Sequence, residues 1–226
     1  AWESLARKLA HEIKNPLTPI QLTIDRLKMK YSEKIETDEK EDFSKSLKII
    51  GKQIKQIENL VNEFSDFARM PKPILKDNNL VEIVNENIKL LKELDYTIEL
   101  NFNSFSETIF FNSDSEQLSR VIFNLIKNSI ESIQEKKQNT LNYKGRIEIE
   151  LNDNDTYIEF MIKDNGVGFG IFQDNIKNIL SPYFTTKEKG TGLGLAIVNK
   201  IINDHQGSLD FKPLEDGAQI KIKFNK

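Results

Sequence analysis

One of the two histidines of this 226-residue chain stands beside a glutamate in the segment "LAHEIKNPLTPIQL" (residues 9–22). On a helix whose buried seam includes Leu9, His11 lies about 200° around the axis and points to solvent. Glu12 is able to accept the Nδ1 proton of the imidazole, which leaves Nε2 with a free lone pair. Asn15, one turn further on, shares the exposed face. This pattern predicts a nucleophilic histidine, with an ordinary kinked surface helix as the alternative.

Two prolines interrupt the same predicted helix. Pro16 leaves the carbonyl of Glu12 without its usual helical donor, and Pro19 does the same for Asn15. We therefore expect the helix to bend or loosen beside His11, so that a mechanical input re-aims the histidine.

Two glycine-rich segments are suited to binding phosphate. "DNGVGFG" (residues 164–170) follows a predicted strand, and "GTGLGL" (residues 190–195) opens a predicted helix. Glycines there permit close backbone approach, and free N–H groups at a helix N-terminus attract phosphate. The second segment lacks the G-x-G-x-x-G spacing because residue 195 is leucine, and no P-loop motif occurs in the chain. Rossmann and P-loop interpretations are therefore weak.

A pair of asparagines adds a possible cation site. Asn124 and Asn128 lie four residues apart on a predicted helix, so both amides project from one face. Their carbonyl oxygens suit Mg²⁺ carrying ATP, and polar surface positions are the alternative. Residues 171–189 have the length and polarity of a mobile lid, with Lys187 and Lys189 available to phosphates; a solvated surface loop is the alternative.

Composition excludes several function classes. There is no cysteine, so disulfides and thiolate metal sites are unavailable. The net charge is -3, from 32 basic and 35 acidic residues, so the chain has no excess of positive charge to attract nucleic acid or anionic lipid. No apolar run approaches the roughly 20 residues that span a bilayer, and the start is neither a methionine nor a signal peptide. We expect a soluble fragment, in which His205, at a helix end before Gly207, has a structural role.

The residues before position 70 predict a helical hairpin. Apolar residues follow a spacing of 4, 3, 4, 3, 4 that keeps a seam facing a partner helix: Ile13, Leu17, Ile20, Ile24, Leu27 and Tyr31. The same alternation recurs between Phe43 and Ala68. Two helices alone expose too much seam, so we expect two copies to pair into a four-helix bundle and form a homodimer.

The segment "RMPKP" (residues 69–73) ends the second helix and marks a domain boundary, giving domains 1–71 and 72–226. The later segments alternate in type, with predicted helices at 80–94, 115–137 and 191–205 and predicted strands at 96–102, 108–112, 145–151, 157–165, 207–211 and 218–224. Adjacent strand pairs favour an α+β domain whose antiparallel or mixed sheet carries helices on one face.

The order of these motifs resembles the sensor histidine kinases of two-component systems. "HEIKNP" is similar to the H box, "NLIKN" to the N box, "DNGVGF" to the G1 box, "PYFTTK" to the F box and "GTGLGL" to the G2 box. The wider context looks most like the NtrY type of nitrogen-regulation kinase. The resemblance implies a dimerisation and phosphotransfer hairpin followed by an α/β-sandwich ATP-binding domain of the Bergerat (GHKL) type.

The resemblance also implies roles for individual residues. His11 would accept the γ-phosphoryl group, Glu12 would be its general base, and Asn15 would position water for dephosphorylation of the partner. Asp164 would bind the adenine amino group, and Asn128 would hold Mg²⁺ and the phosphates. The full set of implied nucleotide-binding residues is Asn124, Lys127, Asn128, Asp164, Gly166, Gly168, Thr186, Lys187, Gly190, Thr191, Gly192, Leu193, Gly194 and Leu195, with Asn124 a second candidate for Mg²⁺.

Four positions depart from the family pattern, one of which is Gly170, which follows Phe169. Val167 stands where relatives often have proline, and Glu131 and Ser132 stand where some carry Lys and Tyr. These departures concern the phosphate contacts of the lid more than the family assignment.

The implied function is an ATP-dependent protein-histidine kinase that hands its phosphoryl group to an aspartate of an NtrX-like response regulator receiver domain, with a reverse phosphatase activity as a further expectation. The fragment would lie on the cytoplasmic side of a protein anchored in the bacterial inner membrane, without itself contacting membrane or nucleic acid. Two alternatives stay open. A gyrase, Hsp90 or MutL-like ATPase would not need His11, and a non-catalytic dimeric scaffold would not depend on Asn128 or Asp164.

Overall fold

The computed structural model describes residues 2–35, 37–93, 95–169, 179–182, 184–185 and 190–226. They form two compact units. The first unit comprises the residues up to Pro71 together with 190–193, and the second comprises the described residues from Lys72 to Thr185 together with Gly194–Lys226.

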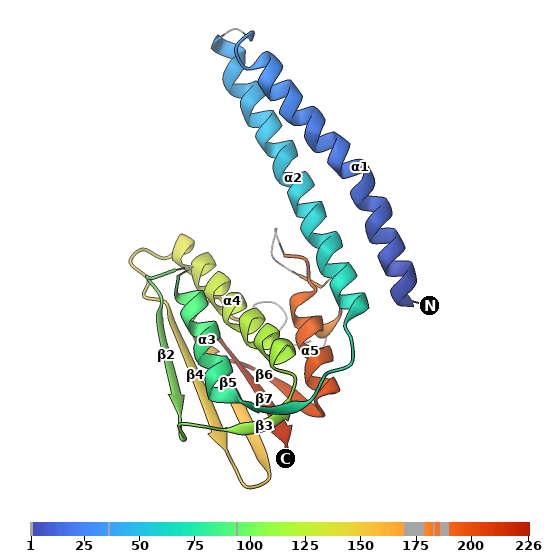
Figure 1. Ribbon diagram of the computed structural model, residues 1–226. Coiled ribbons are helices and arrows are strands. Elements are labelled where there is room, and N and C mark those ends of the chain that lie inside the picture. The colour runs from blue at the N-terminus through green and yellow to red at the C-terminus, as the bar shows by residue number, and fades with distance from the viewer. Residues whose placement is uncertain (1, 36, 94, 170–178, 183, 186–189) are drawn as a thin grey trace. The chain divides into compact units, whose positions relative to one another are not determined.

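The first unit is built on two long helices that pack side by side, α1 (Trp2–Tyr31) and α2 (Thr37–Arg69) (Figure 1). Helix α1 continues through both Pro16 and Pro19, so the predicted loosening does not interrupt it. The Thr23 hydroxyl donates to the Pro19 carbonyl over 2.8 Å, a back-bond that satisfies an acceptor beside the proline pair.

The hairpin core is a heptad stripe from each helix. The buried positions lie seven residues apart and are Ala10, Leu17 and Ile24 on α1 and Leu47, Ile54 and Val61 on α2. The predicted seam is therefore split, because α2 covers only one side of the apolar stripe on α1. Its other side remains 36% to 45% exposed, at Leu9, Ile13, Ile20 and Leu27. The prediction that Leu9, Ile13 and Ile20 lie in a buried seam is wrong for this single chain.

The second unit contains a five-stranded sheet with the order β2-β4-β5-β7-β6. The strands are β2 (Glu99–Ser104), β4 (Arg146–Asp153), β5 (Tyr157–Asp164), β6 (Gly207–Pro213) and β7 (Ala218–Asn225). Strands β2 and β4 are parallel and every other pair is antiparallel. This is the mixed sheet of the predicted α+β fold.

Three helices cover one face of that sheet (Figure 1): α3 (Leu80–Lys92), α4 (Ser115–Asn139) and α5 (Gly194–Asp204). Strand β4 shows how the sequence creates this layer. Ile147 and Ile149 alternate with Glu148 and Glu150, so apolar side chains enter the core and charged ones face away.

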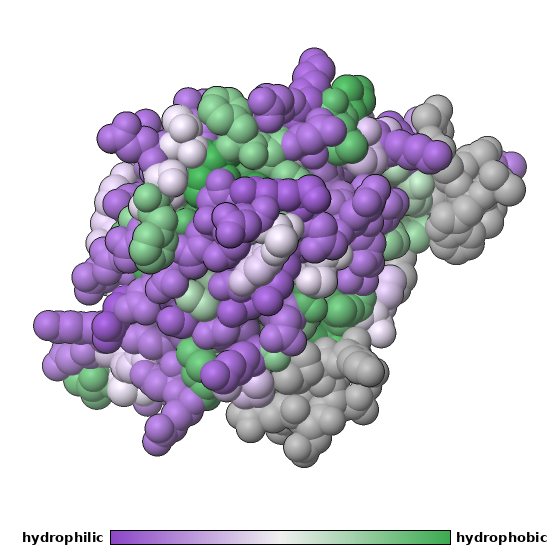
Figure 2. Space-filling model, turned by 90° about the horizontal axis from the view of Figure 1, so that it is seen from below, coloured by the Kyte–Doolittle hydropathy of each residue, from purple (hydrophilic) through white to green (hydrophobic). Residues whose placement is uncertain are grey.

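The open face of the sheet is polar. Glu159 on β5 forms ion pairs with Lys221 (3.2 Å) and Lys223 (3.8 Å) on β7, its neighbour in the sheet. The face of the molecule drawn in Figure 2 is mostly hydrophilic, and its apolar patches are small and separate. In the part of the chain that the structure describes, no helix combines the length and apolar character needed to cross a membrane.

A small second sheet contains one strand that was predicted, near residues 108–112, and one that was not. Strand β1 (Lys76–Asn79) pairs antiparallel with β3 (Phe110–Ser113). Its sequence, "KDNN", has no β-branched or aromatic residue, so it gives no strand signal. The Asn79 side chain accepts from the amides of Val81 (3.2 Å) and Ile109 (3.1 Å), which caps α3 and ties it to the start of β3.

Asp114 links the start of the long helix α4 to two other segments. Its carboxylate caps α4 by accepting from the Gln117 amide (3.1 Å) and also accepts from the Ile74 amide (2.9 Å). Its own amide donates to Nε2 of His205 (3.0 Å). Because Nδ1 of that histidine lies 2.8 Å from the Ile201 carbonyl, Nδ1 carries the proton. Buried His205 therefore has the structural role expected for it.

We expect Asp114→Ala to lower the free energy of unfolding of the second unit by about 2 kcal/mol, since it removes a helix cap and a second amide partner together. Urea denaturation measures this. Asp155→Ala, in the exposed turn between β4 and β5, is the matched control and should change stability by less than about 0.5 kcal/mol. Equal effects of the two substitutions would contradict the role given to Asp114.

Candidate nucleotide site and phosphoacceptor helix

Asn124 presents an oriented oxygen from α4. Its side-chain nitrogen donates to the Arg120 carbonyl over 2.8 Å, so its Oδ1 is left to accept from elsewhere. A methyl group added at Gly194, the first residue of α5, would lie 3.3 Å from that Oδ1. The start of α5 therefore lies directly beside Asn124, and partly buried Asn128 follows one turn later on α4.

A charged pair continues along the same helix. Lys127 and Glu131 lie one turn apart, with Nζ 3.9 Å from Oε1. Lys127 is the cation that lies closest in sequence to both asparagines. Its exposed ammonium is available to an anionic ligand.

Asp164 is a buried carboxylate held in a fixed orientation. It ends β5 and is 9% exposed. The Ser129 hydroxyl donates to one oxygen over 3.1 Å, and the Gly166 amide donates to the other over 2.9 Å. These two donors fix the direction of both carboxylate oxygens.

The loop after Asp164 packs too closely on α4 to allow a side chain at Gly166. A methyl group at Gly166 would lie 2.2 Å from the Ser132 Oγ and 2.7 Å from the Ser132 carbonyl carbon. The same hydroxyl accepts from the Val167 amide over 3.0 Å. The small side chain of Ser132 therefore allows the loop to lie directly on α4.

Gly217 closes the loop from the other side. It has φ of 104°, and an added methyl group would lie 1.9 Å from the Asp164 carbonyl oxygen. Gly168, with φ of 70°, approaches the Gly217 carbonyl, where a methyl group would be only 2.7 Å away. Only glycine fits these two backbone positions. Phe169 then packs edge-on against Phe211 of β6, with ring centres 5.8 Å apart.

Only part of the second glycine segment belongs to the same compact unit as these residues. Gly194 and Leu195 begin α5 in the second unit, whereas Gly190, Thr191, Gly192 and buried Leu193 group with the first unit. Thr186 and Lys187 lie outside the described residues, as does Lys189.

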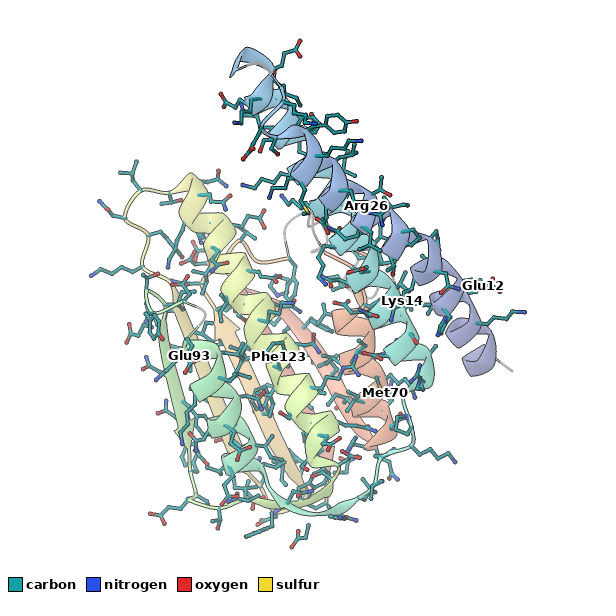
Figure 3. All side chains as sticks on the ribbon, turned by 45° about the horizontal axis from the view of Figure 1, so that its top comes forward. Glu12, Lys14, Arg26, Met70, Glu93 and Phe123 are labelled. Carbon is teal, nitrogen blue, oxygen red and sulfur yellow. The ribbon has the colours of Figure 1, made fainter. Side chains whose placement is uncertain are left out.

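The candidate nucleophile lies on α1. His11 and Asn15 are both exposed and share one side of the helix, turned away from the buried Ala10 and Leu17 stripe. Glu12 extends from the helix surface (Figure 3), and Lys8 is its ion-pair partner, with Nζ 4.0 Å from Oε1. Both side chains of that pair are more than half exposed, so Glu12 is held only weakly.

Family models match both units. Residues 113–226 match the "Histidine kinase-, DNA gyrase B-, and HSP90-like ATPase" family, and residues 1–73 match the "His Kinase A (phospho-acceptor) domain". The chain therefore belongs to the sensor histidine kinases, in which an ATP-binding domain follows a phosphoacceptor domain.

Individual relatives indicate which group of sensor histidine kinases this chain resembles. The chain is 40% identical over 226 residues to a putative sensor histidine kinase NtrY-like of Rickettsia felis, covering all of this chain and 36% of that protein. It is 36% identical over 224 residues to the nitrogen regulation protein NtrY of Azorhizobium caulinodans, covering 99% of this chain and 28% of that protein. The chain thus spans about a third of the length of these curated relatives, and the predicted NtrY-like resemblance is confirmed.

A solved structure shows the same fold. Histidine kinase ThkA, crystallised in complex with the response regulator protein TrrA, aligns with 99% of this chain and 61% of its own, with a TM-score of 0.67 and 23% identity.

Sequence reasoning missed the roles of two serines that shape the site. Ser129 and Ser132 both lie in "NSIES", directly after Asn128 and one helical turn apart. Their hydroxyls hold the Asp164 carboxylate and the loop after it. The signal was present in their spacing, because residues three apart on a helix face the same neighbour.

We expect Gly166→Ala to weaken ATP binding at least about tenfold, because the added methyl group displaces the amide that orients Asp164. Isothermal titration calorimetry with ATP measures this. Gly51→Ala on α2 is the matched control: nothing lies within 4 Å of the added methyl, so binding should be unchanged and α2 stabilised by up to about 1 kcal/mol. Normal ATP binding by Gly166→Ala would show that this loop is not part of the nucleotide site.

Proposed function

We propose that this chain uses ATP to phosphorylate its own His11 and passes the phosphoryl group to an aspartate of a response regulator. The observation that carries the proposal is the presence, in one chain, of an exposed histidine on a phosphoacceptor helix and an oriented, buried carboxylate beside an amide-lined helix.

In this proposal Asp164 accepts a hydrogen bond from the adenine amino group. Asn128 and Lys127 hold phosphate oxygens. Asn124 lies on the same helix, next to the start of α5. The glycines at 166, 168, 190, 192 and 194, together with Thr186, Lys187, Thr191, Leu193 and Leu195, shape the pocket and its lid.

The residues present fit a magnesium ion that arrives with the nucleotide. The oriented Oδ1 of Asn124 and the amide oxygen of Asn128 are hard, neutral ligands. Among the described residues there is no cluster of three or more His, Cys, Asp or Glu side chains able to hold a metal. We infer that phosphate oxygens supply most of the ligands of Mg²⁺, which when bound neutralises the charge of the phosphates.

The chemical step follows from these positions. The Nε2 lone pair of His11 forms a bond to the γ-phosphorus as the bond to the β,γ-bridging oxygen breaks, releasing ADP. Glu12 acts as general base and receives the Nδ1 proton of the imidazolium. Glu12 then returns the proton to Nδ1, and the N–P bond breaks as a carboxylate oxygen of the regulator aspartate bonds to phosphorus, so that neutral imidazole leaves.

Asn15 is assigned to the reverse activity. It lies one turn from His11 on the same exposed face, where its amide is able to orient a water molecule for hydrolysis of the regulator's acyl phosphate. A response regulator as partner is supported by ThkA, which has the same fold and was solved with one. The NtrY-like relatives make an NtrX-like receiver domain the candidate partner.

The exposed half of the hairpin seam supports a homodimer. Ile13, Ile20 and Leu27 on α1 lie seven residues apart, as do Ile50 and Ile57 on α2, and all are at least 36% exposed. A second copy of the hairpin would cover both stripes in a four-helix bundle. Light scattering should give twice the mass of the chain, and a monomer mass at micromolar concentration would contradict this.

We propose that this part lies on the cytoplasmic side of a kinase anchored in the inner membrane, with no membrane or nucleic-acid contact of its own. Phosphorylation of the membrane-bound full-length protein by ATP added to inside-out vesicles tests this, and phosphorylation only in right-side-out vesicles would contradict it.

Incubation with γ-labelled ATP and Mg²⁺ should place acid-labile, base-stable label on the protein, and His11→Gln should abolish it. Asn128→Ala should also abolish the label by removing an amide from the pocket. Asn139→Ala, near the exposed end of the same helix, is the matched control and should retain it. ATP hydrolysis without labelled protein would favour an ATPase that does not use His11, and labelling that survives Asn128→Ala would contradict the assigned pocket.

A further inference from the structure

Three residues from distant segments meet beneath the loop that follows Asp164. Lys136, near the end of α4, places its Nζ 3.2 Å from the Asn165 carbonyl oxygen and 3.1 Å from that of Gly166. It also forms an ion pair with Asp216 in the turn between β6 and β7. The Tyr143 hydroxyl hydrogen-bonds to the same Asn165 carbonyl and lies 3.2 Å from the Asp216 carboxylate.

The peptide group between Asn165 and Gly166 connects this cluster to the candidate adenine contact. A trans peptide is planar, so its C=O and N–H point in opposite directions. The Gly166 N–H donates to the Asp164 carboxylate, and the Asn165 C=O on the other side accepts from Lys136 and Tyr143. Any rotation of this peptide that turns the N–H from Asp164 also turns the C=O from its two donors.

We propose that Lys136, Tyr143 and Asp216 form an anchoring cluster that sets the affinity for adenine nucleotide by fixing the 165–166 peptide, and so the Asp164 carboxylate. The three are positioning residues, since they act through the loop backbone. The proposal rests on the proposed function of Asp164.

The Asn165 side chain restrains the same point independently. Its Oδ1 accepts from the Arg146 amide over 2.7 Å, and its Nδ2 donates to the Lys144 carbonyl over 2.9 Å. These bonds tie the loop to the start of β4, but they leave the peptide that follows Asn165 free to rotate. The anchoring cluster restrains that remaining rotation.

Charge strengthens the cluster. Burial opposes the charged ammonium, but hydrogen bonds with Asp216 and Tyr143 raise the pKa of Lys136 above its ordinary value. The hydrogen bond from Lys136 lowers the pKa of Asp216 below its ordinary value. Both groups therefore stay charged throughout the neutral range, and the ammonium also lies 4.8 Å from the centre of the Tyr143 ring.

The cluster is not needed to hold the domain together. The Asp216 side chain is 62% exposed, and the core beside α4 is built from fully buried apolar residues such as Ile126 and Ile133. Loss of the cluster should therefore change ligand affinity more than the stability of the unit.

The test is Lys136→Met in the full chain, with calorimetric titration of ATP and Mg²⁺ and the rate of self-labelling at varied ATP. We expect the Kd and KM for ATP to rise about tenfold, the labelling rate at saturating ATP to stay within about twofold, and Tm to fall by less than about 4 °C. Asp216→Asn and Tyr143→Phe should raise KM in the same direction by smaller factors, and Lys136→Arg should recover part of the affinity. Lys221→Met, which removes a lysine from an ion pair on the open sheet face, is the matched control and should leave KM unchanged.

The outcomes separate this proposal from the proposed function. If the unaltered chain binds ATP and all three cluster variants bind it equally well, the anchoring role is wrong and the proposed function stands. If Lys136→Met and Asp216→Asn weaken binding and also lower Tm by more than about 4 °C, and Lys136→Arg recovers neither the affinity nor the Tm, the cluster is merely structural. Failure of the unaltered chain to bind ATP overturns both proposals.

Discussion

The orientation of the Asp164 carboxylate is the constraint on which the candidate site depends. It is buried at the end of a central strand, where one oxygen accepts from Ser129 and the other from the Gly166 amide. A buried carboxylate is costly unless it is hydrogen-bonded, so the surrounding residues must supply those donors. Gly166 packs closely on Ser132, and Gly217 packs closely on the Asp164 carbonyl, so the loop that supplies the Gly166 donor is tightly held.

The two units divide the chemistry between them. Helix α4 supplies amide oxygens, a cation and the serine that orients Asp164, all from one 25-residue helix capped by Asp114. The hairpin supplies an exposed histidine on a helix whose opposite face is buried. Pro16 and Pro19 leave α1 continuous, so an input that re-aims His11 would act on an intact helix that lacks two of its backbone hydrogen bonds.

Much of this architecture follows from local sequence. The helices of the second unit are close to their predicted ranges because their apolar periodicity and caps agree, and the alternation in β4 and β5 marks both strands. Strand β1 had no such signal, and the buried half of the hairpin seam could not be told from the exposed half, since both fit the same heptad pattern. The anchoring cluster was beyond prediction for another reason: Lys136, Tyr143 and Asp216 meet only through the tertiary fold.

The proposed nucleotide site depends most directly on Asp164 as a fixed acceptor for the amino group of adenine. The measurement that tests it is calorimetric binding of ATP and of GTP to the chain and to Asp164→Asn. Because guanine presents a carbonyl oxygen where adenine has an amino group, we predict that ATP binds about a hundredfold more tightly than GTP, and that Asp164→Asn loses most of this difference. Equal affinities for ATP and GTP in the unaltered chain, or a preference for ATP that survives Asp164→Asn, would contradict the account.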